Sequence, residues 1–545
     1  MVFTPKYPGV AWLSAITLFG FALRLQLLDR FALHRDEAIY AFWARYFWEN
    51  DLLFLSVWPD KPPLFIVLLS AALELLGTDP AASRYLNIAI STLTIPVVAA
   101  LATRLWHGRS GLAAAAAMAF SPYAISFSPT LFTDPLLVLA GSLGIYFALR
   151  RRLYWTGFWV GVAIMTKQQG LLYLPLIAML LAVGGGRISR IEAPRALTLL
   201  FAGLLTVLLP VLYWDSLRWD VAPSPWDLAV RNYGVLSLLP LAEWPTRIAS
   251  WRPLLLVMVS GWVIWLSLAI LPIWSALSRI YRQRRGANTP IAAGALPNTR
   301  FYLILLWGAF FCLLHIAASV AIWDRYLLPL APLVALTIGW IVTTALARVN
   351  AYLPWRRSPM PAIALVALTL LPAATSAATG GYPIGGDRGA YSGLQAALSW
   401  LQTEAPSQAI LYHRSLGWHY QFYLYDDVQT GDIQLRWFPS EVYLADNVIK
   451  AAHRARFVLQ PDWEPLRGLD RQLQIRRFNM KERFNAGHFT VYEIVYVGPA
   501  SCAWCLCELR PEWTSPLPDW GGEVSGYCSD QISLVRHITE SRSQC

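Results

Sequence analysis

The sequence predicts a mainly α-helical membrane protein with about eleven spans and a small α/β domain near its C-terminal end. Of its 545 residues, 56% are hydrophobic and only 14% are charged, whereas soluble proteins carry about 25% charged residues. The 26 tryptophans often stand at the ends of long apolar runs, where an amphipathic ring prefers the headgroup level. The net charge of +11 does not indicate nucleic-acid binding, because the basic residues form short clusters between the apolar runs.

Eleven apolar runs are long enough to predict membrane spans. They lie near 9–28, 82–103, 110–127, 131–149, 153–167, 168–184, 196–214, 253–275, 301–320, 327–346 and 360–378. If the N-terminus is cytoplasmic, every arginine-rich short loop lies inside, as expected for cytoplasmic loops. These loops contain Arg104 and Arg109, Arg150 to Arg152, Arg187, Arg190 and Arg195, Arg279 to Arg285, and Arg348, Arg356 and Arg357.

The same rule decides how the apolar run from Pro62 to Leu76 is placed. Counting this run as a span would invert the orientation of everything after it, so we expect a juxtamembrane helix on the outer face. The pair of runs at 153–184 is short for two spans. Broken helices of this kind are tolerated where they line a cavity.

The composition divides the chain into three parts. We expect a transmembrane domain at 1–379, an extracytoplasmic α/β domain at 380–498 and a cysteine-containing, disordered tail without a catalytic role at 499–545. In the α/β domain, helix-like stretches at 390–404 and 440–453 alternate with β-prone runs. These runs are Ala409 to His413, Asp432 to Phe438, Arg456 to Gln460 and Phe489 to Val497.

The tail contains five of the six cysteines, namely Cys502, Cys505, Cys507, Cys528 and Cys545. They could form disulfides or a zinc knot. On the oxidising side of the membrane disulfides are favoured, and five cysteines leave one unpaired.

Two motifs in the first outer loop contain candidate site residues. Asp36 and Glu37 stand at the start of an amphipathic helix (HRDEAIYAFWARYF), where acids also occur simply because they favour a helix N-terminus. Asp60 and Lys61 follow in Asp-Lys-Pro-Pro, for which a turn with a snorkelling lysine is the structural alternative.

Three further charges border the predicted spans on the same outer side. Asp134 opens the fourth span in Leu-Phe-Thr-Asp-Pro, Lys167 interrupts an apolar run in Met-Thr-Lys-Gln-Gln-Gly, and Arg325 stands in Trp-Asp-Arg-Tyr. Charged groups inside or beside spans are costly and usually face a partner or a functional cavity.

An outward-facing cavity with these acids and cations suits transfer from a lipid-linked sugar phosphate. The leaving group of such a donor is already a stable phosphate anion. Cations are therefore needed to hold that anion, and one carboxylate is needed to deprotonate the acceptor hydroxyl. A second carboxylic acid to protonate the leaving group is not required, in contrast to a glycoside hydrolase.

The order of the motifs resembles that of the GT-C glycosyltransferases. The similarity is greatest to the branch with protein O-mannosyltransferases, bacterial aminoarabinose transferases and lipopolysaccharide-core galacturonosyltransferases. It rests on Asp-Glu, Lys-Pro-Pro, Ser-Arg-Tyr-Leu-Asn (83–87), Thr-Asp-Pro, Met-Thr-Lys-Gln-Gln-Gly and Arg-Tyr-Leu-Leu-Pro-Leu-Ala-Pro (325–332). It covers residues 1–180 best and returns at 323–332.

The resemblance implies a polyprenyl-phosphate-linked sugar as donor and a lipid, glycan or protein as acceptor. It also assigns roles to the candidates: Asp36 as catalytic base, Glu37 beside it at the acceptor or a metal, Asp134 as a second cavity acid, and Lys61, Lys167 and Arg325 as ligands of the carrier phosphate. A divalent metal ion is left open, with Glu37 and Asp60 as candidate ligands. The glycine that usually follows the family lysine is replaced by Gln168, with Gly170 later.

A secondary transporter or flippase of lipid-linked sugars is the alternative from another functional class. Transporters place polar residues near the membrane midplane and commonly show inverted repeats, whereas the charges here gather at one face. A non-catalytic scaffold would not need Lys167 or Asp134.

Overall fold

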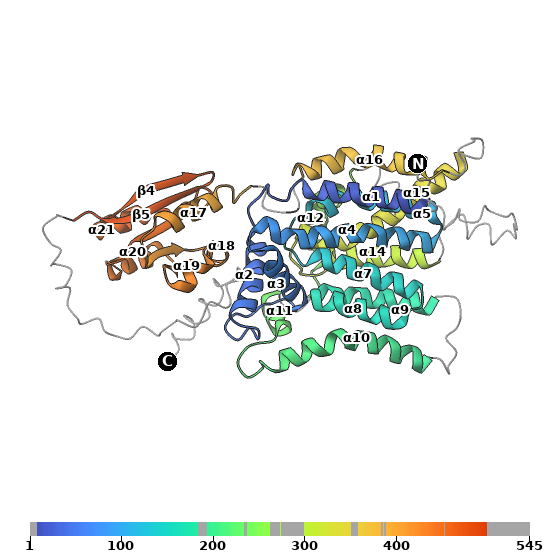
Figure 1. The fold of residues 1–545 in the computed structure, drawn as a ribbon, viewed down its shortest axis with the longest axis horizontal. Coiled ribbons are helices and arrows are strands. Elements are labelled where there is room, and N and C mark those ends of the chain that lie inside the picture. Colours follow the sequence, from blue (N-terminus) through green and yellow to red (C-terminus); the bar gives the residue numbers. More distant parts are fainter. Residues whose placement is uncertain are drawn as a thin grey trace, which may run out of the picture. The chain divides into compact units, whose positions relative to one another are not determined.

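The computed structural model describes residues 8–498 except 184–192, 234–236, 262–272, 274–298, 350–357, 383–384, 386–388 and 452 (Figure 1). The predicted tail with its cysteines lies outside the described residues. The chain forms two compact units, Met1–Arg30 with Asn50–Gly386, and Phe31–Glu49 with Asp387–Cys545. The segment Phe31–Glu49 thus groups with the C-terminal part of the chain, whereas the sequence analysis assigned it to the transmembrane domain.

The first unit is a bundle of α-helices (Figure 1). Its α-helices are α1 (Pro8–Leu25), α3 (Leu64–Leu76), α4 (Pro80–Leu105), α5 (Gly108–Ala119), α6 (Pro122–Ser126), α7 (Asp134–Leu149), α8 (Leu153–Thr166), α9 (Tyr173–Val183), α10 (Ala193–Ser216), α11 (Pro225–Tyr233), α12 (Trp244–Met258), α14 (Thr299–Ala317), α15 (Ala331–Val349) and α16 (Met360–Ala378). In the part of the unit that the structure describes, three 3₁₀ helices interrupt them, η1 (Gln168–Leu172), η2 (Leu241–Glu243) and η3 (Asp324–Leu330).

Many of these helices are apolar enough to cross a membrane. Among the described residues, five are also long enough, namely Pro80–Leu105, Pro194–Ser216, Thr299–Ala317, Asp324–Ala347 and Met360–Ala378. Five shorter apolar helices accompany them, namely Gly9–Leu25, Leu64–Leu76, Asp134–Leu149, Leu153–Thr166 and Gln168–Val183. The prediction is confirmed in a coarser form: the chain is mainly helical, and several of its described helices are apolar enough to cross a membrane. The expected span at 253–275 lies largely outside the described residues.

Helix α3 is too short to span a bilayer. Its 13 residues extend about 20 Å at 1.5 Å per residue, against a hydrocarbon core about 30 Å thick. The helix agrees in length with the juxtamembrane element predicted at 62–76.

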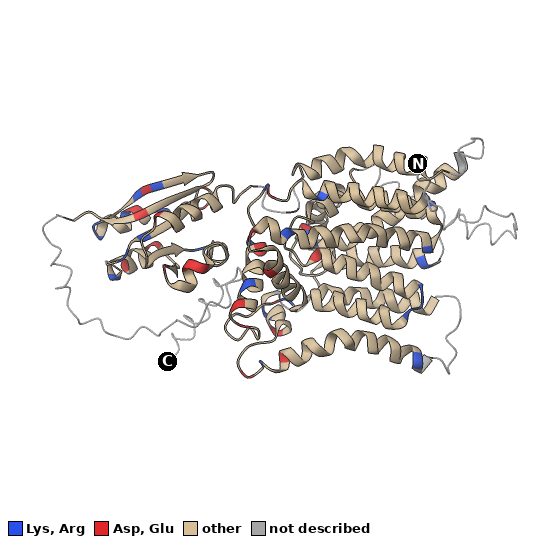
Figure 2. Ribbon diagram, viewed as in Figure 1, with Lys and Arg blue, Asp and Glu red and all other residues tan. Residues whose placement is uncertain are grey.

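Helices α7 and α8 form an antiparallel hairpin that separates the charges of this region. The two helices pack side by side, so that Asp134 and Lys167 lie at one end while Arg150 to Arg152 form the turn at the other. Figure 2 shows that the bundle's charged residues gather near helix ends, with the middle of most helices free of charge.

Helix α10 approaches α8 closely because glycines line their contact. A Cβ atom at Gly157 would lie 1.9 Å from the carbonyl oxygen of Leu200, and one at Gly203 would lie 1.9 Å from that of Tyr154. Small residues of this kind let helix backbones meet in membranes, where the hydrophobic effect gives no drive for association.

The second unit is built on a five-stranded sheet with the order β2-β1-β3-β5-β4. Strand β1 (Ala409–His413) pairs in parallel with β2 (Ile433–Trp437) and with β3 (Arg456–Pro461). Strand β5 (Phe489–Tyr496) is antiparallel to β3 and to β4 (Phe478–Ala486). Among its described residues, this unit has six helices, namely α2 (Arg35–Glu49), α17 (Leu394–Glu404), α18 (Gly417–Tyr423), α19 (Tyr425–Thr430), α20 (Glu441–Lys450) and α21 (Leu469–Ile475).

Alternating side chains of β1 enter two separate cores. Ala409 and Leu411 pack on one face with residues of α17 and α18, whereas Ile410 and Tyr412 pack on the other face with residues of α20 and α21. This alternation follows from the two-residue period of a strand. The unit is therefore a three-layer α/β/α sandwich.

Strand β4 was not predicted. It lies at the sheet edge, and its sequence FNMKERFNA leaves most side chains at least partly exposed. An edge strand with charges discourages pairing with other chains, but the same charges hide it from a search for β-prone apolar runs.

Candidate functional site

The core of the candidate site is an ion pair between the ends of α7 and α8. Lys167 has extended backbone (φ −160°, ψ 139°) and ends α8. Its Nζ donates a hydrogen bond of 2.6 Å to Oδ1 of Asp134, and the two side chains are only 7% and 1% exposed. A charge buried in an apolar bundle needs such a partner, so the pair fixes both helix ends.

Gly170 lets the chain turn back on α8 directly after Lys167. A Cβ at this position would lie 2.4 Å from the carbonyl carbon and oxygen of Ala163. The N–H of Gly170 also donates to the carbonyl of Lys167 at 2.8 Å. Gln168 stands where the family usually has a glycine, and the glycine that the local packing requires here is Gly170.

A second buried ion pair lies in the loop before α3. Nζ of Lys61 donates to Oδ1 of Asp60 at 3.0 Å, and both side chains are buried. Asp60 also accepts from Nδ2 of Asn232 at 3.2 Å through its carboxylate and from Nε2 of Gln168 at 2.9 Å through its backbone carbonyl. Gln168 therefore joins the Lys167 turn to the Asp60–Lys61 pair.

Arg325 completes a group of three cations. Lys61 and Arg325 both lie near enough to act electrostatically on Lys167. The guanidinium carbon of Arg325 lies 4.7 Å from the ring centre of Phe132, and Nζ of Lys167 lies 4.4 Å from that of Tyr326. Aromatic faces of this kind stabilise cations, so the cluster keeps three positive charges together with Asp60 and Asp134.

Asn87 from the Ser-Arg-Tyr-Leu-Asn motif shapes the loop before Asp134. Its Nδ2 donates to the carbonyls of Thr130 and Phe132 at 2.6 and 2.8 Å. Nearby on the same helix, the buried Arg84 donates to the carbonyl of Leu28 at 3.1 Å. These contacts give the motif a structural role, because they satisfy backbone oxygens where no helix does so.

The sequence analysis missed a polar network beside Lys167. Nε2 of Gln169 lies 3.3 Å from Nε2 of His315 and donates to the carbonyl of Tyr326 at 3.2 Å. The carbonyl of His315 in turn accepts from Trp251 at 3.1 Å and from Arg247 at 2.9 Å. The signal in the sequence that could have indicated this network is His315, a single histidine near the end of an apolar run.

Asp36 and Glu37 lie in the second unit, at the first turn of α2. The buried carboxylate of Glu37 accepts from the backbone N–H of His34 at 2.8 Å, and the N–H of Asp36 donates to Nδ1 of His34 at 3.1 Å. This contact of Glu37 is one that a glutamate makes at a helix N-terminus, so it fits the structural alternative for this residue. It does not define the role of Asp36.

Both ends of α2 are attached to helices of the C-terminal segment. Nε2 of His419 donates to the carbonyl of Leu33 at 3.0 Å, and the hydroxyl of Tyr423 accepts from the N–H of Leu33 at 3.3 Å. Burial lowers the pKa of His419 to about 3, so the imidazole is neutral and carries its proton on Nε2. The segment leading into Asp36 is thereby fixed.

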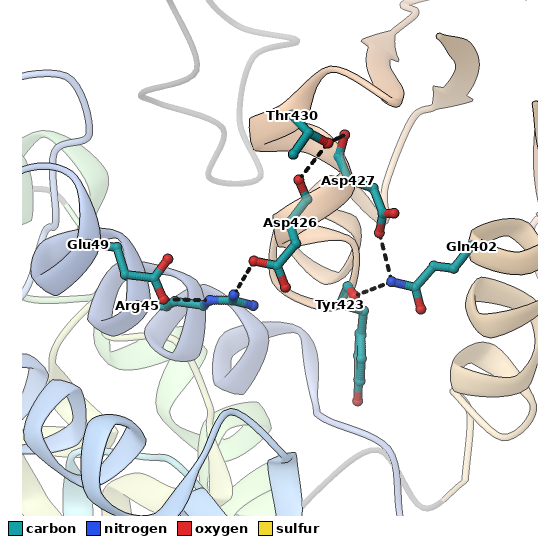
Figure 3. Close-up of polar contacts among 7 residues, drawn as sticks. All are labelled: Arg45, Glu49, Gln402, Tyr423, Asp426, Asp427 and Thr430. Carbon is teal, nitrogen blue, oxygen red and sulfur yellow. Dashed lines mark hydrogen bonds and ion pairs between the residues drawn. The ribbon is translucent and has the colours of Figure 1, made fainter. Parts of the chain in front are cut away.

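Further along α2, Arg45 makes the other attachment (Figure 3). It pairs with Asp426 at 2.5 Å and with Glu49 at 2.9 Å, and its guanidinium carbon lies 4.0 Å from the ring centre of Tyr425. Figure 3 also shows Gln402 of α17 bonded to Asp427, which ties α19 to the rest of the sandwich.

The metal candidates do not come together in one unit. Glu37 belongs to the second unit and Asp60 to the first. In the described part of the chain, no group of three or more His, Cys, Asp or Glu side chains is arranged to hold a metal ion.

Comparisons with known proteins bear on the family and the fold of the chain. Residues 60–214 match the dolichyl-phosphate-mannose-protein mannosyltransferase family, and this segment includes Asp60, Lys61, Asp134 and Lys167. A search of curated proteins gave no match.

Solved structures with a similar fold cover most of the chain. ArnT from Cupriavidus metallidurans in the apo state has a TM-score of 0.63 at 16% identity, over 89% of this chain and 98% of that chain. The same protein bound to undecaprenyl phosphate gives 0.60 at 16% identity, over 89% and 97%. The oligosaccharyltransferase AglB from Archaeoglobus fulgidus, in complex with an inhibitory peptide and a dolichol-phosphate, gives 0.53 at 12% identity, over 84% and 70%.

The chain has the fold of these ArnT and AglB structures, and its residues 60–214 match the mannosyltransferase family model. The resemblance predicted from the sequence is confirmed in this form, because the family match and the ArnT fold both belong to the branch that the motifs indicated.

The buried ion pair of Lys167 and Asp134 leads to a prediction about stability. Replacing Asp134 by Asn leaves Lys167 without its anionic partner, which should lower the free energy of unfolding by about 3 kcal/mol or more. Adding Lys167→Gln removes the uncompensated charge, so the double variant should regain much of that loss. Thermal unfolding of the purified proteins in nanodiscs measures both effects. A single variant as stable as the wild type, or a double variant no better than the single one, would contradict the account.

Proposed function

We propose that this protein is a membrane glycosyltransferase that moves a sugar from a polyprenyl-phosphate donor to a lipid, glycan or protein acceptor at the extracytoplasmic face. The observation that carries the proposal is the group formed by Lys61, Lys167 and Arg325 around buried acids. The similar fold of an ArnT structure bound to undecaprenyl phosphate supports it.

The three cations would hold the phosphate of the donor. The acceptor oxygen attacks the anomeric carbon while the bond from that carbon to the phosphate oxygen breaks, and the electron pair leaves with the polyprenyl phosphate. Fixed cations stabilise the charge that develops on this leaving group. Asp134 acts as a positioning residue, because its contact at 2.6 Å sets where Nζ of Lys167 lies.

Asp36 would accept the proton of the acceptor hydroxyl. Glu37 accepts from the N–H of His34, which supports a positioning role for Glu37. Asp36 is the candidate base because of its place in the Asp-Glu motif of the first outer loop. If the acceptor is an ionised phosphate group, no base is required, and Asp36 would position the substrate instead.

The orientation of the chain is also part of the proposal. The arginines at the α4–α5 turn (Arg104, Arg109) and at the α7–α8 turn (Arg150 to Arg152) would lie in the cytoplasm, because short basic loops remain inside. Lys167 and Asp134 at the other end of the α7–α8 hairpin would then face outward.

A reporter fusion tests this orientation. An enzyme that is active only outside the cytoplasm, fused after residue 380, should be active, because the chain would leave α16 on the outer side. Activity of a cytoplasm-dependent reporter at the same position would show that the orientation is inverted.

Charge removal tests the donor site. Lys61→Ala and Arg325→Ala should each weaken use of the polyprenyl-phosphate sugar, since a charge-assisted hydrogen bond contributes about 1.5 to 3 kcal/mol. Arg109→Ala at the opposite end of the bundle is the matched control and should leave donor kinetics unchanged. Equal donor kinetics in all three variants would remove Lys61 and Arg325 from the site.

Asp36→Asn tests the base. The substitution keeps the shape of the side chain and its tolerance at a helix start but removes its basicity, so turnover on a hydroxyl acceptor should fall by roughly a hundredfold or more. Donor binding should survive. The measurement is turnover with labelled polyprenyl-phosphate sugar in nanodiscs.

Glu37→Gln is the control for this experiment. Its amide oxygen can still accept from the N–H of His34, so we expect a smaller loss of turnover. Full activity of purified Asp36→Asn on a hydroxyl acceptor would rule out the mechanism.

A further inference from the structure

Two neighbouring glutamines, Gln168 and Gln169, follow Lys167 directly and open the 3₁₀ helix η1. Successive residues of a 3₁₀ helix are about 120° apart around its axis, because the helix has about three residues per turn. Adjacent side chains therefore point in different directions from one short turn. The two amides reach different parts of the chain, and each contacts a segment that carries a further cation of the candidate site.

Gln168 holds the segment that contains Lys61. Its Nε2 donates to the backbone carbonyl of Asp60 at 2.9 Å, where the backbone is irregular. The carboxylate of Asp60 accepts from Nζ of Lys61 at 3.0 Å and from Nδ2 of Asn232 at 3.2 Å. Asp60 is thus tied to Gln168 through its backbone and to Lys61 through its side chain. The amide of Gln168 therefore bears on where the ammonium group of Lys61 lies.

Gln169 holds the segment that contains Arg325. Its Nε2 donates at 3.2 Å to the backbone carbonyl of Tyr326, the residue after Arg325 in η3. The same nitrogen lies 3.3 Å from Nε2 of His315, whose Nδ1 lies 2.8 Å from the carbonyl oxygen of Phe311. A carbonyl only accepts, so Nδ1 carries the proton and Nε2 of the neutral imidazole accepts from Gln169. Both N–H groups of Gln169 are therefore used, which fixes the direction of its amide.

The three cations need fixed attachments because they repel one another. Lys61 and Arg325 both act electrostatically on Lys167, and like charges at close range raise the energy of the site. The three residues come from separate stretches of the chain, so the local sequence does not keep their spacing. Fixed charges stabilise an anion best when they need not rearrange as it forms. Bonds between the three segments therefore supply the attachment that the charges alone oppose.

We propose that Gln168 and Gln169 are positioning residues that set the spacing of the three cations for a polyprenyl phosphate. This inference rests on the proposed donor site and adds the groups that support it. Both amides act through backbone carbonyls beside the cations, and neither is a catalytic residue. A glycine at position 168 would have no side chain, so the residue usual in the family could not make the first of these two bonds.

Binding of tritiated undecaprenyl phosphate to the full chain in phosphatidylcholine nanodiscs tests the proposal. Gln168→Met and Gln169→Met keep the length of the side chain but remove both N–H donors. Each should weaken binding by about fivefold, the effect of one neutral hydrogen bond. Gln26→Met is the matched control and should bind as the wild type does, because the exposed amide of Gln26 donates to the carbonyl of Ala22 within one segment.

Double variants show whether each amide acts through its own cation. In Lys61→Ala the group that Gln168 positions is gone, so adding Gln168→Met should weaken binding by less than about twofold. In Arg325→Ala the same substitution should keep its full effect. Gln169→Met should show the opposite pattern. A general loss of stability would weaken binding alike in both backgrounds, so the crossed pattern separates positioning from a merely structural role.

Two results would overturn the inference alone. One is an amide variant that binds as tightly as the wild type although Lys61→Ala and Arg325→Ala bind weakly, and the other is an equal effect of that variant in both backgrounds. If Lys61→Ala and Arg325→Ala themselves bind as the wild type does, the proposed donor site is contradicted, and the inference with it. Far-UV circular dichroism shows whether each variant keeps its fold. The two amides contact different segments, so either one can decide the outcome.

Discussion

The arrangement of α7 and α8 in the first unit depends on one requirement, namely that a charged side chain buried in an apolar bundle needs an oppositely charged partner. Lys167 and Asp134 are 33 residues apart in the chain, and they meet because α7 and α8 return antiparallel to one another. The turn at the other end of this hairpin contains Arg150 to Arg152, which stay near solvent. The hairpin therefore separates charges that are buried and paired from charges that are exposed.

Where helices are interrupted, backbone carbonyl groups likewise need partners, in this case hydrogen-bond donors from side chains. The loop before Asp134 has no helical partner for the carbonyls of Thr130 and Phe132, and Asn87 supplies both hydrogen bonds. Past Lys167 the side chain of Gln169 does the same for the carbonyl of Tyr326. Irregular backbone persists at membrane depth only when protein groups or a polar cavity satisfy it, so the polar residues that shape the site also make its broken helices possible.

Local sequence patterns predict most of the helices and strands, but not which distant residues contact one another. The β-prone run at 409–413 coincides with β1, and the predicted helix at 440–453 contains α20. These two elements could be predicted because the hydrophobic periodicity and charge spacing that indicate them are set by residues close together in the sequence. The contact of His419 with Leu33 joins residues 386 positions apart, and neither residue carries a local signal of it. The charged edge strand β4 was missed because its exposure removes the apolar pattern.

The attachment of α2 explains how a C-terminal domain could influence the acceptor. The flanking residues Arg30 and Asn50 belong to the first unit, whereas α2 itself packs with α18 of the second. Asp36 therefore stands on a helix that is held at its start by the contacts of His419 and Tyr423 with Leu33, and further along by the ion pair of Arg45 with Asp426. On the proposed mechanism, a change among those residues alters how the base is held, whereas the cations that hold the donor belong to the first unit. Acceptor choice and donor binding can then vary separately, because different parts of one chain position the groups on which each depends.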